Sequence, residues 1–241
     1  MTLVPLIAAH MHVSERETAH TWPDGQKDDA AWEDCTWMSG LELARLAHSL
    51  AIPATHAEGE LLRDAAGEPP TNGSNADDLN RGFAARYHWT ARKVSGFAAL
   101  WAALTPGTAA MAQGRTGAFP AGHRLRRWQP GFTTGHAVFI ARVDEVERVW
   151  WCDPLAPVGT YQGEWVSKAE LKAYVDAFGG SHLVAPIIVV TTGGDMPALT
   201  SYIPGYIATV KKTANVRSSP VLPTPTPTNI IRVVSTPEQW V

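Results

Sequence analysis

The hydrophobic period changes halfway along the chain, and this change constrains the fold more than any other feature. After Asp34, apolar residues recur at the spacing of one helical face. This spacing predicts a helix that stops before Pro53. The same spacing predicts a helix over 94–104, and Asn75 is placed to cap another over 76–87. The first half is therefore expected to be helical.

The second half has the pattern of strands. Residues 135–143 and 147–153 read as two strands with Asp144 and Glu145 at the turn, and 182–192 reads as a buried strand. Between them, Ser167 and Glu170 form a capping box that opens a helix through Phe178. Helices followed by strands predict an α+β fold in which N-terminal helices pack on an antiparallel sheet.

Charge and composition divide the chain near residue 195. The 241 residues carry a net charge of -3, and every charge after Pro197 except Glu238 is basic. A Pro-Thr repeat at 223–228 favours extended backbone in this basic tail. We predict a domain at 1–195, a linker at 196–208 and a small β-rich segment at 209–241. The net charge gives no reason to expect nucleic acid as a partner.

Membrane insertion and export are not expected. The uncharged run 94–114 is interrupted by Pro106-Gly107, so we interpret it as a helix, a turn and a strand. The N-terminus has no basic region before its apolar stretch, which also contains Pro5. The sequence therefore predicts no signal peptide.

Cys35 is the first candidate for chemistry. It follows Asp34, a good N-cap residue, so its sulfur is expected in the first turn of a helix. Unpaired backbone N–H groups there favour an anion and lower the pKa of a thiol. The alternative is that Cys35 is a small buried apolar residue.

His136 and Asp153 are the second and third candidates. If Asp144-Glu145 is a two-residue turn, His136 and Asp153 lie opposite each other on one face of the hairpin. A longer loop shifts the pairing but leaves Asp153 a near neighbour. A cysteine, a histidine and a carboxylate together provide a nucleophile, a proton carrier and a group that orients the imidazole. The structural alternative for Asp153 is a turn former before Pro154.

These residues resemble a known family. Cys35-Thr-Trp-Met-Ser-Gly at a helix start, Gly135-His136-Ala-Val-Phe-Ile, and Trp151-Cys-Asp153-Pro154 are similar to motifs of papain-like cysteine peptidases of the bacteriocin-processing (peptidase C-thirty-nine-like) group. The resemblance covers about residues 20–190. It implies a papain-like fold with Cys35 as nucleophile, His136 as general base and acid, and Asp153 as the orienting residue. The glutamine expected in the oxyanion hole is replaced by Asp29, and Gln26 is the nearest substitute.

The tail has a resemblance of its own. Residues 208–220, with Asn215-Val216-Arg217 at their centre, and 230–234 resemble the opening of a bacterial SH3-like wall-binding module. Together the two resemblances imply a phage lysin-like peptidase that hydrolyses peptide bonds of peptidoglycan. It would act from a virion, or from the host cytoplasm with release to the cell wall. The alternatives are a peptidase for a protein or leader peptide, and an inactive papain-like protein that binds other phage tail proteins, which Asp29 favours.

Two competing roles remain for the histidines and cysteines. His10 and His12 would share one face of a strand as a zinc pair, with His20 nearby. Cys35 and Cys152 would form a disulfide if neither is catalytic. We expect neither arrangement, and the proposed chemistry requires no metal and no cofactor.

Overall fold

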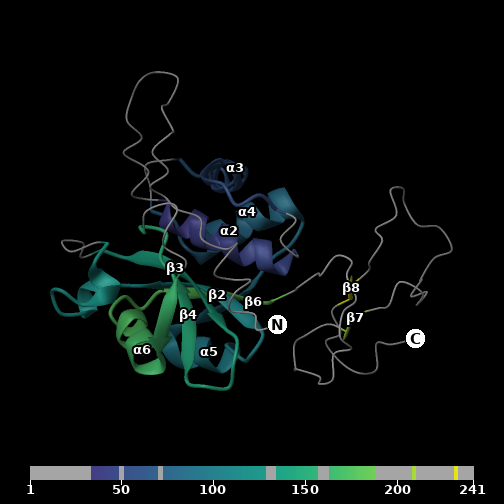
Figure 1. The fold of residues 1–241 in the computed structure, drawn as a ribbon. Helices are drawn as coiled ribbons and strands as arrows, with labels where there is room; N and C mark the ends of the chain where they lie inside the picture. Colours follow the sequence, from purple (N-terminus) through teal and green to yellow (C-terminus); the bar gives the residue numbers. More distant parts are fainter. Residues whose placement is uncertain are drawn as a thin grey trace, which may run out of the picture.

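The protein has an α+β fold built on one antiparallel sheet (Figure 1). The computed structural model describes residues 34–48, 52–69, 73–128, 134–156 and 163–187, together with the backbone of two short strands at 208–209 and 231–232. The sheet has six strands in the order β1-β6-β2-β3-β4-β5. They are β1 (Arg92–Ser95), β2 (Thr108–Gly114), β3 (His136–Arg142), β4 (Arg148–Cys152), β5 (Glu164–Ser167) and β6 (Ser181–Pro186).

Helices cover both faces of this sheet. On one face lie α2 (Cys35–Ala47), α3 (His56–Ala66) and α4 (Ala76–Tyr87), and on the other lie α5 (Gly96–Ala103) and α6 (Lys168–Asp176), as Figure 1 shows. Two 3-10 turns, Thr116–Ala118 and Arg124–Arg126, follow β2. The prediction of helices packed on an antiparallel sheet is confirmed. The helices do not all precede the strands, however, because α5 and α6 alternate with them.

The central strand β3 shows how the core is divided. Phe139 packs with α2 and α4, whereas Val138 and Ile140 pack with α5 and α6. Successive side chains of a strand point to opposite faces, so a strand covered on both faces is apolar throughout. Helix α2 is buried along nearly its whole length, since it lies between the sheet and the other two helices of its layer.

All four predicted helices are present, and α4 has its predicted bounds. Asn75 caps α4 through a capping box, and Ser167 and Glu170 form the predicted box at the start of α6. Helix α2 ends at Ala47, earlier than the predicted stop before Pro53. Helix α3 was not expected, although Thr55 accepts a hydrogen bond from the backbone N–H of Glu58 in a typical helix-start spacing.

The interpretation of 94–114 is confirmed. Helix α5 ends before the turn at Pro106-Gly107, and β2 follows directly. Strands β1 and β5 were not predicted, and β1 includes Val94, which the periodicity assigned to the helix. In the described part of the chain, no helix is both long and apolar enough to cross a membrane.

Only two short strands of the tail are described. They are β7 (Ala208–Thr209) and β8 (Ile231–Arg232), which pair antiparallel. Both lie in segments that carry the SH3-like resemblance. The remainder of 196–241 is outside the described residues, so the linker and module boundaries stay predictions.

Candidate functional site

Cys35 is the first residue of α2, as predicted. Asp34 occupies the N-cap position, and its backbone carbonyl accepts the first helical hydrogen bond from Met38 N at 2.9 Å. Its carboxylate does not cap the helix and pairs with Arg63 of α3 instead. The first-turn N–H groups of α2 therefore receive no side-chain cap from Asp34, and they favour a negative charge at this end of the helix.

The predicted register between β3 and β4 is wrong by two residues. Phe139 faces Cys152 and Ile140 faces Trp151, because the connection is longer than a two-residue turn. Asp144 stabilises the longer loop: its carboxylate accepts a hydrogen bond from Val146 N and pairs with Arg148. His136 and Asp153 are consequently not directly opposite each other in the ladder.

His136 and Asp153 nevertheless form a buried pair. The distance from His136 Nε2 to Asp153 Oδ1 is 2.9 Å, and the two residues are 3% and 1% exposed. Asp153 Oδ1 also accepts a hydrogen bond from Leu155 N at 2.9 Å. Asp153 thus forms the turn before Pro154 and holds the imidazole at the same time, so both interpretations of this residue apply.

The thiol of Cys35 lies against the start of β3. The backbone N–H of Ala137 donates to Cys35 Sγ at 3.4 Å, which places the sulfur one residue from His136 along the strand. Two hydroxyl groups hold this backbone in place: Tyr174 donates to the His136 carbonyl at 2.6 Å, and Ser39 donates to the Ala137 carbonyl at 3.2 Å. Burial raises the pKa of Tyr174 well above its usual value, so its phenol remains a donor.

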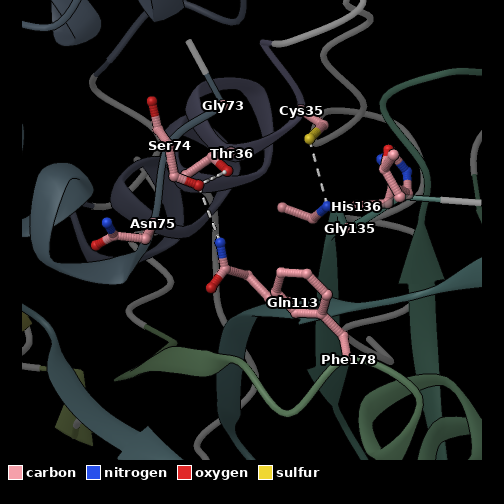
Figure 2. A pocket seen from close by; sticks show the side chains of 11 residues that line it. Cys35, Thr36, Gly73, Ser74, Asn75, Gln113, Gly135, His136 and Phe178 are labelled. Atoms are coloured by element: carbon pink, nitrogen blue, oxygen red, sulfur yellow. Dashed lines mark hydrogen bonds between the residues drawn. The ribbon is translucent and has the colours of Figure 1, made fainter.

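Cys35 and His136 line one pocket of about 450 Å³ (Figure 2). The pocket lies where the start of α2, the segment before α4, the end of β2, the start of β3 and the chain after α6 meet. Apart from Cys35 and His136, none of its lining side chains is ionisable. The remaining lining residues are Thr36, Gly73, Ser74, Asn75, Gln113, Thr134, Gly135, Ala137 and Phe178.

Gln113 supplies a fixed amide to this pocket. Its Nε2 donates to the Ser74 carbonyl at 3.0 Å, and Thr36 Oγ1 donates to the same carbonyl at 2.9 Å, as Figure 2 shows. This bond identifies the nitrogen side of the amide, because a carbonyl oxygen only accepts. Sequence reasoning did not single out Gln113. The predicted oxyanion residue Gln26 lies outside the described residues, as does Asp29.

His182 holds the backbone behind Gln113. Its Nδ1 accepts a hydrogen bond from Gln113 N at 3.1 Å, in a position where a strand carbonyl would normally accept. The ring is fully buried, and burial lowers its pKa from 6.5 to about 4. His182 is therefore neutral near pH 7, with its proton on Nε2.

We expect His182 to make the fold less stable in acid. Its pKa is lower in the folded than in the unfolded chain, so its contribution is present above pH 6.5 and is lost as the pH falls toward 4. The loss amounts to about 3 kcal/mol in the free energy of unfolding. Urea denaturation between pH 7 and pH 4 measures it. The variant H182N keeps an acceptor without a titrating ring, and its loss should be smaller by this amount; equal losses in both proteins would contradict the prediction.

The carboxylate of Asp34 belongs to a ring of four ionisable side chains, with His56, Glu60 and Arg63. Arg63 Nη1 lies 3.0 Å from Asp34 Oδ1, and His56 Nε2 lies 3.4 Å from Asp34 Oδ2. Glu60 closes the ring, with 3.8 Å to His56 Nδ1 and 3.8 Å to Arg63 Nη2. All four residues are buried. Acidic and basic groups alternate around the ring, and Arg63 already binds Asp34, so we interpret it as an ion-pair network.

The disulfide alternative is excluded by the structure. Cys35 and Cys152 are both free thiols, with Cys35 partly exposed and Cys152 fully buried in β4. Burial raises the pKa of the Cys152 thiol well above its usual value. The two cysteines thus differ strongly in environment. The proposed zinc pair His10 and His12, with His20, lies outside the described residues.

The sequence was compared with known protein families and with curated proteins. No protein family and no curated protein matches the sequence.

Proposed function

We propose that the chain is a papain-like cysteine hydrolase that cleaves peptide bonds of bacterial peptidoglycan. One observation carries the proposal: Cys35, at a helix start, shares a pocket with His136, whose Nε2 is held by Asp153 at 2.9 Å. A nucleophile, a base and a residue that orients the base are the parts that this chemistry requires.

The hydrogen bonds of Asp153 favour one tautomer of His136. Asp153 Oδ1 accepts from both Leu155 N and His136 Nε2, so Nε2 carries a proton. The unprotonated Nδ1 is then the ring nitrogen that accepts the proton of the Cys35 thiol. Transfer of the Cys35 proton to Nδ1 gives a thiolate and an imidazolium, and the start of α2 favours the anion.

Hydrolysis would follow in two stages. The Cys35 thiolate attacks the carbonyl carbon of the scissile bond, and His136 donates its proton to the departing amine, which leaves an acylated cysteine. His136 next removes a proton from water, which attacks the thioester and releases the acid product and the thiol. Backbone N–H groups at the start of α2 would face the developing oxyanion, with Gln26 as the proposed second donor.

The pocket favours an uncharged substrate segment. Apart from Cys35 and His136 its side chains are neutral, and Gln113, Ser74 and Asn75 offer polar groups to a peptide backbone. The choice of peptidoglycan rests on the resemblance of the basic tail to a wall-binding module. The same pocket is compatible with a protein or leader peptide, which is the second candidate.

Two substrates separate these candidates. The full chain is incubated with purified bacterial cell walls and, in parallel, with a denatured protein, and newly formed amino groups are measured. The proposal expects release from cell walls that exceeds release from the protein. Cleavage of the protein alone would support the second candidate, and no release from either would indicate an inactive binding protein.

A further inference from the structure

The buried carboxylate of Asp34 lies next to the proposed nucleophile in the sequence, and its negative charge affects the ionisation of the thiol. Asp34 directly precedes Cys35, and it is only 1% exposed, so water screens its charge poorly. A poorly screened negative charge on the neighbouring residue disfavours the thiolate and raises the pKa of the thiol. An uncompensated Asp34 carboxylate would thus oppose formation of the Cys35 thiolate.

Arg63 compensates this carboxylate. It is 2% exposed and donates from Nη1 to Asp34 Oδ1 at 3.0 Å, with no solvent between them. Glu60 and His56, the other members of the ring, lie on the same helix as Arg63. Because α3 supplies the other three members of the ring, it also holds Asp34, the N-cap residue of α2, in place. Arg63 does not line the pocket, so it acts through Asp34.

We propose that Arg63 is a positioning residue of the nucleophile: it neutralises Asp34 and anchors the first turn of α2, so that the Cys35 thiolate is stabilised. This inference rests on the proposed function, in which Cys35 reacts as a thiolate. Helix α3 contributes no residue to the pocket lining and none of the predicted catalytic residues, so this role is additional to theirs.

Other titratable groups lie in the neighbourhood of Cys35. They are His136 on β3 with its partner Asp153, and Tyr174 on α6, whose phenol stays protonated. These groups are unchanged when α3 is altered. A test that varies only Arg63 and Asp34 therefore isolates the contribution of the ring.

The test is the rate of alkylation of Cys35 by iodoacetamide as a function of pH, with modified residues identified by mass spectrometry. We expect R63Q to raise the apparent pKa of Cys35 by about one unit, because Asp34 is left uncompensated. The double variant D34N/R63Q should return the pKa close to that of the wild type. A role limited to packing predicts no such rescue.

R81Q is the matched control. Arg81 pairs with Glu68 and Asp78 but is 53% exposed, so this variant should titrate like the wild type. If R63Q does not fold, D34N alone serves, and it should lower the pKa of Cys35 because Arg63 remains. An unchanged titration in R63Q or D34N, or a double variant as shifted as R63Q, would overturn the inference. An ordinary thiol pKa in the wild type would instead contradict the proposed function, while the differences between variants remain measurable.

Discussion

The variant C35A is expected to lower hydrolysis of the substrate by about 10⁴-fold or more. Removal of the nucleophile from a catalytic group that acts as a unit eliminates nearly all of its rate enhancement. The side chain lost is small and only partly buried, so the fold should persist. Release of amino groups by the wild type and the variant, at equal protein concentration, measures the effect.

The second cysteine provides a matched control for this change. C152A makes the same substitution at a fully buried position on β4 outside the pocket lining. It should reduce stability modestly, through a small cavity, and leave the hydrolysis rate close to that of the wild type. Residual activity in C35A comparable to that of C152A would contradict the assignment of the nucleophile.

H136A should lower hydrolysis by about 10²- to 10⁴-fold. In the proposed mechanism His136 takes the thiol proton and returns it to the leaving amine, and the variant removes this group. It also leaves Asp153 buried without its imidazole partner, so thermal unfolding of the variant is measured alongside activity. The rate is followed from pH 5 to pH 9, and the wild-type dependence on an ionising base should disappear in H136A.

H123A is the control for loss of a histidine. His123 stacks on Phe119, at a ring-centroid distance of 4.5 Å, and does not line the pocket. Its removal should not change the pH profile. A wild-type profile in H136A, or the same loss in H123A, would be inconsistent with His136 as the base.

The sequence predicted that His136 and Asp153 lie close together, but it did not predict the register of the hairpin that carries them. His136 and Asp153 meet although the predicted register is wrong by two residues. The reason is that Asp153 lies beyond the last residue of β4, where the chain turns and the carboxylate is no longer restricted to its ladder position. The register differs because the loop is longer than two residues, and contacts of Asp144 with Val146 and Arg148 stabilise this longer loop.

Residues that support the site from a distance were not predictable. Asp34 and Arg63 are 29 residues apart, and Gln113 contacts Ser74 across 39 residues. Hydrophobic period indicates which face of an element is buried, but it does not indicate which elements become neighbours. Tyr174 lies within the helix predicted to run through Phe178, and its hydrogen bond to the His136 carbonyl depends on how α6 packs against the sheet.

The sequence of α3 contains local signals for the start and the end of a helix, but it lacks a clear apolar periodicity. Thr55 and Glu58 have the spacing of a helix start, and Gly67 ends the helix with a positive φ. The apolar positions of α3 are sparse, because charged side chains occupy its buried face. Periodicity is a weak guide where a helix buries ion pairs in place of apolar side chains.

The most direct test of the central claim is alkylation of the native wild-type protein at pH 6 and pH 7, with each cysteine quantified separately. The account predicts that Cys35 reacts rapidly at both pH values, because its thiolate is stabilised by His136 and by the start of α2. Cys152 should react only after denaturation, since burial raises its pKa and excludes the reagent. Equal and slow labelling of Cys35 and Cys152 in the native protein would contradict the account.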